Sequence, residues 1–143
     1  MSKIIFIFFF LYTLLEGNKN IWDFTHSFDL KKDQICKIKI VKDYKKTFQN
    51  QGILKFRWTL YHNKRLVFLL DYEGFKKQFI LETRHKLNAI KVFLTDDYKR
   101  IDQRPFGIIK FVSFDASKHK AKIDLYVRDR AKRLEIKILT PFK

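Results

Sequence analysis

The sequence predicts an all-β domain built as an antiparallel β-sandwich, and three observations lead to this prediction. Apolar and polar residues alternate with a period of two in most segments after residue 18, whereas a period of 3.6 residues is scarce. These segments are short and follow one another through brief polar turns. The hydrophobic content of 46%, with 16 Phe, is enough for a core, and 143 residues suit one domain better than two.

The stretch at residues 53–61, ILKFRWTLY, shows the alternation most clearly. In a strand of this sequence, Phe56 and Trp58 fall on one face, and Lys55 and Arg57 fall on the other. Strands with one apolar and one polar face are typical of a sheet that covers a core on one side and meets water on the other. We therefore expect this stretch to be a half-buried strand.

Two turn signals connect this stretch to the segments that follow it. The dipeptides NK at residues 63–64 and EG at residues 73–74 contain residues that tolerate left-handed backbone conformations, which tight hairpins need. The middle of the second strand is apolar on both faces, so we expect it to lie inside the sheet. The result is a predicted antiparallel meander with strands at residues 53–61, 65–73 and 75–83.

Five further segments have the composition or the alternation of strands. They lie at residues 35–41, 87–94, 108–114, 121–128 and 134–139. Residues 44–52 and 95–107 are the longest predicted loops, and residues 18–32 fit either an edge strand or a short helix. Strands at such regular spacing predict an antiparallel β-sandwich of immunoglobulin-like or related type, with about seven or eight strands.

The N-terminal residues 1–17, MSKIIFIFFFLYTLLEG, have the pattern of an export signal. Lys3 precedes an apolar run at residues 4–15, which is shorter than the roughly 20 residues that a membrane-spanning helix needs. The segment ends in a small glycine, as cleavage requires, although the leucine two residues earlier is large for such a site. We expect a secretory signal peptide at residues 1–17 and a single domain at residues 18–143. An uncleaved anchor and a buried N-terminal strand are the alternatives.

An export signal changes which partners are expected. The predicted location is the periplasm, with the domain either free or tethered to the membrane by residues 1–17. Envelope proteins are the expected partners there, and an anionic polymer or lipid is the alternative ligand of a basic surface. Nucleic acid and small-molecule substrates are not expected in this setting.

The chain is strongly basic, with 31 Lys and Arg against 15 Asp and Glu and a formal net charge of +16. Such a charge attracts anionic polymers and surfaces in a salt-dependent manner. A candidate polyanion-binding or partner-binding patch is predicted at Lys118, Lys120, Lys122, Arg128, Arg130, Lys132 and Arg133. The alternative is a hydrated charged face that keeps an aromatic-rich sheet soluble and blocks pairing at its edges.

Binding of single-stranded nucleic acid requires aromatic and basic side chains on the same face, so that bases stack while phosphates pair. In residues 53–61 the two kinds alternate to opposite faces, and apolar and basic residues separate in the same way in residues 35–41 and 136–138. Tyr61 and Tyr126 are exceptions because they share a face with polar neighbours. The pattern therefore favours a sheet with a hydrated basic face over a nucleic-acid platform.

The sequence contains no recognisable catalytic motif, and its histidines lack the spacing of metal ligands. Cys36 is the only cysteine and lies on an apolar strand face, where a buried core residue is the expected role. Asp96, Asp97 and Asp102 are interleaved with Lys and Arg, as in loop salt bridges. We expect neither an enzyme nor a cofactor, and a hydrolase that uses these three acids is the catalytic alternative.

Together these features predict a non-enzymatic interaction or scaffold subunit of a larger assembly in the cell envelope. Long loops and exposed edge strands would make the contacts, including by strand addition. The alternative is a basic module that binds lipopolysaccharide, anionic lipid, cell-wall polymer, or nucleic acid if residues 1–17 are not an export signal. Under this alternative, the basic residues at 118–133 should form one contiguous patch.

Overall fold

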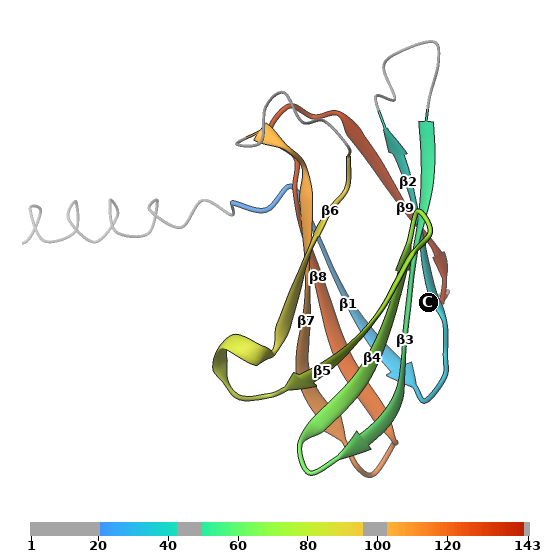
Figure 1. The fold of residues 1–143 in the computed structure, drawn as a ribbon, viewed down its shortest axis with the longest axis vertical. Helices are drawn as coiled ribbons and strands as arrows, with labels where there is room; N and C mark the ends of the chain where they lie inside the picture. The colour runs from blue at the N-terminus through green and yellow to red at the C-terminus, as the bar shows by residue number, and fades with distance from the viewer. Residues whose placement is uncertain (1–20, 43–49, 96–102, 142–143) are drawn as a thin grey trace, which may run out of the picture.

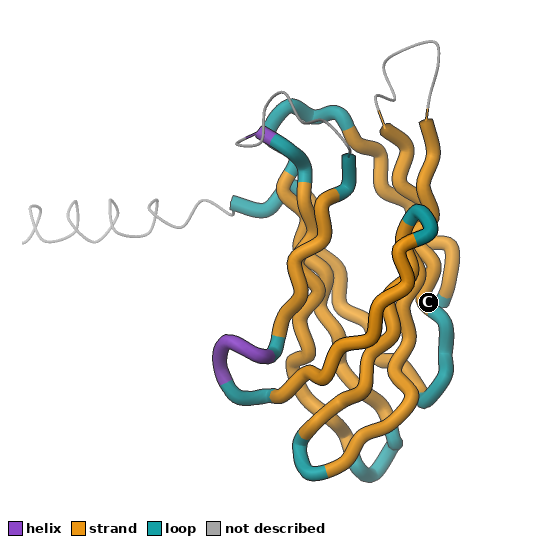
Figure 2. The backbone as a smooth tube through the Cα atoms, viewed as in Figure 1, coloured by secondary structure: helices purple, strands orange, loops and turns teal. Residues whose placement is uncertain are grey.

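The computed structural model describes residues 21–42, 50–95 and 103–141, and these residues form two antiparallel β-sheets that face one another (Figure 1). Strands account for most of the described chain, with short loops between them (Figure 2). The prediction of an all-β fold with two antiparallel sheets is confirmed. The predicted signal peptide lies outside the described residues.

The described residues contain nine strands and one short 3-10 helix. Across the four-stranded sheet, the order is β1 (Phe24–Lys31), β8 (Lys120–Arg128), β7 (Phe106–Asp115) and β6 (Ala89–Phe93). Across the five-stranded sheet, the order is β5 (Phe75–Glu82), β4 (Arg65–Tyr72), β3 (Asn50–His62), β2 (Cys36–Lys42) and β9 (Leu134–Thr140). The 3-10 helix η1 (His85–Leu87) lies between β5 and β6 along the chain.

The described residues contain one strand more than the eight segments that the sequence predicted, and this additional strand is β1. β1 shows that residues 18–32 contain an edge strand rather than a short helix, and this strand pairs antiparallel with β8. The consecutive strands β3, β4 and β5 form the predicted meander, with β4 inside the sheet. β3 already begins at Asn50, so the predicted loop at residues 44–52 is shorter than expected.

Both predicted hairpin turns contain the left-handed residues that tight turns need. Asn63 and Lys64, between β3 and β4, have φ angles of 48° and 63°. Glu73 and Gly74, between β4 and β5, have φ angles of 51° and 84°. Positive φ at both central residues is the mark of a type I′ turn, whose twist matches that of the flanking strands. The two turns therefore fix the register of the meander at both ends of β4.

Three connections cross between the sheets and define two ends of the molecule. Residues 32–35 join β1 to β2, and η1 joins β5 to β6. Both crossings lie at the end that also carries the β3–β4 and β7–β8 turns, which we name the turn end (Figure 1). Residues 129–133 join β8 to β9 at the opposite end, which we name the crossover end.

The core lies between the sheets and takes side chains from both. Phe56 and Phe68 of the five-stranded sheet and Phe111 of the four-stranded sheet are each at most 1% exposed. The rings of Phe28 and Phe56 meet edge-on across the sheets, with centroids 5.6 Å apart. Burial of one large apolar side chain contributes about 1.5–3 kcal/mol, so this core is the main source of stability.

Two hydrogen bonds tie the sheets together inside the core. The indole N–H of Trp58 in β3 donates to the backbone carbonyl of Leu30 in β1 at 2.8 Å. The Tyr72 hydroxyl at the end of β4 donates to the carbonyl of Leu94, just after β6, at 2.8 Å. Both bonds satisfy side-chain donors that burial removes from water, and they hold the two sheets at a fixed offset.

Replacing Trp58 tests the first of these ties. Trp58→Phe keeps a ring in the core but removes the N–H donor and leaves a gap, so we expect the free energy of unfolding to fall by about 2 kcal/mol. Trp22→Phe outside the core is the matched control and should lower it by less than about 1 kcal/mol. Urea unfolding followed by circular dichroism measures both, and equal stabilities would contradict the role assigned to Trp58.

Candidate anion-binding surface

The outer surface of the five-stranded sheet is basic because strand pairing collects cations from four strands. Their neighbours along each strand, such as Ile38 and Phe56, point inward and are buried. We define the basic face as six outward cations, which are Lys37 and Lys39 of β2, Lys55 and Arg57 of β3, Lys76 of β5 and Lys137 of β9. A seventh outward cation, Arg65 of β4, is not included because it forms an ion pair with Glu82 of β5.

Within the basic face, the register places like charges directly beside one another. Lys37 lies opposite Lys55 on the neighbouring strand, and Lys39 lies opposite Lys137. Like charges at directly opposed positions of an antiparallel pair destabilise a sheet. An anion bound between them would offset this repulsion, so the arrangement favours a negatively charged partner.

Acidic side chains on this surface are fewer than cations. Asp71 of β4 lies opposite Lys55 on one side and Lys76 on the other, so one carboxylate stands between two lysines in the register. Glu135 of β9 lies beside Val41 of β2, near the crossover end. The basic face therefore keeps an excess of positive charge around its centre.

An open groove of about 500 Å³ runs over β3, β4 and β5 within this surface. Its cationic lining includes Lys55, Arg57 and Lys76, and its apolar lining includes Leu69 and Ile35. Ile35 is 42% exposed, so apolar area remains accessible beside the charges. A groove with both kinds of lining fits an anionic group that also carries an apolar part.

The basic residues predicted at 118–133 lie in two groups rather than in one contiguous patch. The group at the turn end consists of Lys118, Lys120 and Lys122. The group at the crossover end consists of Arg128, Arg130, Lys132 and Arg133. β8 has 9 residues, and at about 3.3 Å per residue its two ends lie roughly 25 Å apart. Residues that are close in the sequence therefore lie far apart here, because an extended strand separates them.

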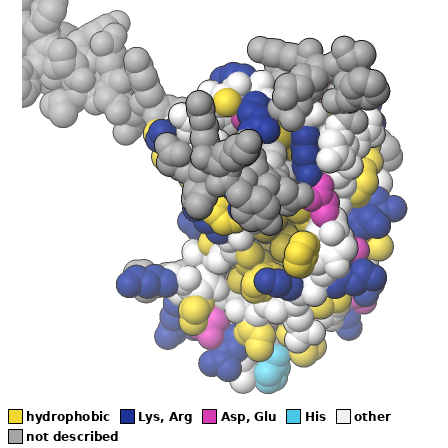
Figure 3. Space-filling view, turned by 45° about the horizontal axis from the view of Figure 1, so that its top comes forward, with side chains coloured by type: hydrophobic (Ala, Val, Ile, Leu, Met, Phe, Trp, Pro, Cys, Tyr) yellow, Lys and Arg dark blue, Asp and Glu magenta, His cyan; other side chains and the backbone are white. Residues whose placement is uncertain are grey.

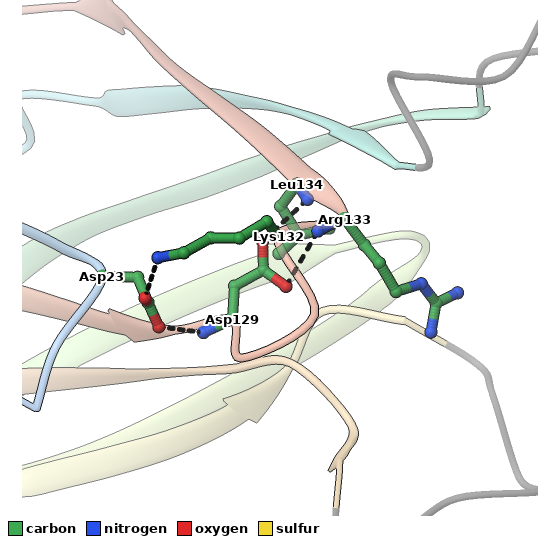
Figure 4. A network of polar contacts seen from close by, with 5 residues as sticks. All are labelled: Asp23, Asp129, Lys132, Arg133 and Leu134. Carbon is green, nitrogen blue, oxygen red and sulfur yellow. Dashed lines mark hydrogen bonds and ion pairs between the residues drawn. The ribbon is translucent and has the colours of Figure 1, made fainter.

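A network of hydrogen bonds organises the crossover end (Figure 4). Asp129 is 4% exposed, and its carboxylate accepts hydrogen bonds from the backbone N–H groups of Arg133 and Leu134 at 3.1 and 2.8 Å. The Asp129 N–H donates to Asp23 at 2.6 Å, and Lys132 forms an ion pair with Asp23. One of the predicted binding residues, Lys132, is therefore ion-paired within the domain at this end.

Competing effects set the pKa of the Asp23 carboxyl. Burial raises this pKa, but hydrogen bonds from Lys132 and from the Asp129 amide, together with the positive charges of Lys132 and Arg128, lower it further than burial raises it. The pKa therefore lies below its ordinary value of 3.8. Such a carboxyl stabilises the fold fully above its unfolded-state pKa, and this stabilisation is lost as the pH falls through the folded-state pKa.

Removing the charge of Asp23 should make this pH dependence visible. We expect Asp23→Asn to lower the free energy of unfolding by about 1 kcal/mol at pH 7, the lower part of the range for a charged hydrogen bond near solvent. Because the wild-type carboxyl becomes protonated in acid, the difference between the two proteins should shrink below about pH 4. Urea unfolding at a series of pH values measures it, and a difference that does not change with pH would contradict this role.

Aromatic and basic side chains share the outer surface of the four-stranded sheet. The rings of Trp22 and Phe106 meet edge-on with centroids 6.1 Å apart, and those of Trp22 and Tyr126 lie 5.4 Å apart. The ammonium of Lys91 lies 4.2 Å from the centroid of the Phe106 ring. The predicted separation of aromatic and basic side chains holds in β3 up to Trp58, after which a bulge turns Leu60 outward and Tyr61 toward the core. The sequence made no such prediction for this surface, where pairing unites residues from four separate segments.

The described residues contain no group of three or more His, Cys, Asp or Glu side chains that could hold a metal ion. His26 packs along β1 against the rings of Phe24 and Phe28, with centroids 6.5 and 4.6 Å away. The three acids of the catalytic alternative fall within residues 96–102, outside the described residues.

Cys36 is fully buried at the start of β2, which confirms its predicted place in the core. Burial raises the pKa of its thiol to about 12, because a thiolate would lose its hydration there. The thiolate is the reactive form of cysteine, so this side chain has neither the access nor the protonation state of a nucleophile.

The reactivity of Cys36 should therefore report unfolding. At pH 8 and without denaturant, we expect a maleimide to label the folded protein at least about a hundredfold more slowly than a free thiol. Labelling in urea should accelerate in step with the loss of circular dichroism. Fast labelling of fully folded protein would contradict the buried position.

Comparison with known proteins finds no matching family model, no matching curated protein and no matching solved structure. In the described part of the chain, no helix has the length and hydropathy of a membrane span. The basis for a function is therefore the arrangement of this chain's own side chains.

The sequence shows that cations alternate with apolar residues in single strands. It does not show which strands pair to bring these cations together in the basic face. Residues 37–39 and 55–57 already show cations at every second position. Their union with Lys76 and Lys137 depends on the strand order, in which the C-terminal β9 returns to the edge beside β2. No local pattern in the sequence marks that return.

Proposed function

We propose that this chain is a non-enzymatic interaction subunit of the cell envelope, exported by residues 1–17 and then either released from that segment or tethered by it. Its domain, residues 18–143, would be a β-sandwich of immunoglobulin-like or related type in the periplasm. The observation that supports this function is the basic face, which presents opposed lysines and a groove on one surface. The partner would be an envelope protein with an acidic surface.

The geometry of the basic face suits a contact with another protein. Its side chains stand on strands whose opposite faces are fixed in the core, so binding would order little additional backbone. The groove adds apolar area to the charges, which matters because exposed ion pairs alone contribute little binding energy. The positive field would also speed the encounter with an acidic partner, and salt would slow it.

A second candidate, a polyanion-binding module, is favoured by the outer surface of the four-stranded sheet. Trp22, Phe106 and Lys91 bring two rings and a cation together there. Such a combination could engage a charged polymer by stacking and ion pairing. The ligand would be lipopolysaccharide, anionic lipid or cell-wall polymer, or nucleic acid if residues 1–17 are not an export signal.

Neutralising part of the basic face tests the proposed function. The variant carries Lys37→Gln, Lys39→Gln and Lys55→Gln, and it is crosslinked in its native envelope beside wild-type protein. We expect the yield of stoichiometric envelope partners to fall at least about tenfold, because the partner loses its opposing charges. Thermal stability should stay equal or rise, since the opposed lysine pairs are removed. N-terminal sequencing of the recovered protein checks whether residues 1–17 have been cleaved.

The matched control removes the same charge at the turn end through Lys118→Gln, Lys120→Gln and Lys122→Gln. It should recover partners as well as wild-type protein does. Equal losses in both variants would show that net charge rather than the basic face matters, as for a polyanion-binding module. Recovery of nucleic acid with an intact N-terminus would overturn the envelope location.

A further inference from the structure

The free edge of β5 has backbone groups that are available for pairing. In the β4–β5 turn, the N–H of Phe75 is placed to bond the carbonyl of Tyr72, and bonding to β4 then alternates along β5. The backbone N–H and C=O groups that point away from β4 therefore belong to Lys76, Gln78, Ile80 and Glu82. Among the described residues, none of them forms a backbone hydrogen bond with a further segment.

Apolar side chains are exposed along this same edge. Phe75 is 70% exposed and Ile80 is 58% exposed, values far above those of the core. Figure 3 shows hydrophobic side chains gathered in the middle of the molecule's surface, with Lys and Arg around them. An edge with free backbone groups and accessible apolar side chains is a template for an added strand.

The charges around this edge indicate which kind of segment could pair with it. Lys76 and Lys77 lie on β5, whereas Glu82, the acid of this strand, forms an ion pair with Arg65 of β4. A second copy of this chain would bring another net charge of +16 to the same edge, which opposes self-association. A segment that alternates acidic and apolar residues would instead match both the lysines and the exposed apolar side chains of β5.

We propose that an acidic, extended segment of the partner protein adds to the five-stranded sheet as an antiparallel strand along β5. This inference rests on the proposed function and identifies how the partner binds. The free groups of Lys76, Gln78, Ile80 and Glu82 form the ladder of hydrogen bonds with it. Alternate apolar side chains of the segment cover Phe75 on the inner side.

The groove of the basic face continues this binding site. Its lining includes Lys76 and Gln78 of β5 together with Lys55 and Arg57 of β3. Acidic side chains on the outer side of the added strand therefore lie beside the cations that rim the groove. Strand addition gives affinity through the backbone ladder, and these charges select an acidic sequence over a basic one.

The test uses a synthetic peptide as long as β5 in which glutamate and valine alternate, and a comparison peptide with lysine in place of glutamate. Fluorescence polarisation at low salt measures binding to the full chain. NMR hydrogen exchange then measures protection of the amides of residues 76, 78, 80 and 82. We expect the acidic peptide alone to bind and to slow exchange at these amides at least about tenfold.

A proline substitution isolates the backbone contribution. Ile80→Pro removes one outward N–H while leaving the bonds to β4 in place, as edge strands allow. We expect it to weaken binding of the acidic peptide at least about tenfold, whereas Ile80→Thr, which keeps the N–H, weakens it by no more than about threefold. Circular dichroism and thermal unfolding confirm that both variants are folded.

Four results would overturn the addition of a partner segment to β5. Peptide binding without protection of the four amides, or unchanged binding by Ile80→Pro, would place the ligand elsewhere. If neutralising Lys37, Lys39 and Lys55 then abolished binding, the basic face would stand as the site while strand addition failed. No binding at low salt would reject strand addition, and the envelope crosslinking would still decide the proposed function. Protection of the four amides in a dimer of the protein alone would assign the edge to a second copy.

Discussion

Burial of alternate side chains between the two sheets is the constraint from which the surface chemistry follows. In β3, Phe56 and Trp58 must face the core, so Lys55 and Arg57 must face outward. A slip of one residue in the register would turn every one of these side chains to the wrong side, which makes the parity hard to change. The hydrogen bond from Trp58 to Leu30 holds this parity against the opposite sheet. The packing of the core therefore determines that these cations face outward and form the basic face.

The local part of this architecture could be predicted from the sequence. Alternation located the strands, and residues with a tolerance for positive φ located the turns at Asn63-Lys64 and Glu73-Gly74. These signals act over a few residues, and single-sequence patterns record such short-range preferences well. The existence of one apolar core could also be predicted, because the whole chain has enough large apolar residues to form it.

The non-local part could not be predicted in the same way. The pairing of β9 with β2 and of β1 with β8 joins segments about a hundred residues apart, as Asp23 and Asp129 illustrate with a separation of 106. Alternation shows that a side chain points away from the core but does not show which strand lies beside it. The basic residues at 118–133 lie in two groups for this reason, because β8 separates those near its start from those near its end. The aromatic surface around Trp22 escaped notice because its rings lie on different segments.

The contact between Asp23 and the 129–133 crossover also has a mechanical consequence. Asp23 directly precedes β1, and it is fastened to Lys132 and to the Asp129 amide. In a chain tethered through its N-terminal segment, tension would reach the packing of Trp22 and then this contact before it reached β1. The load would then pass into β8, which lies inside its sheet between β1 and β7, rather than peeling β1 away from its first residue. The domain is thus fastened at the point where a tether would pull on it.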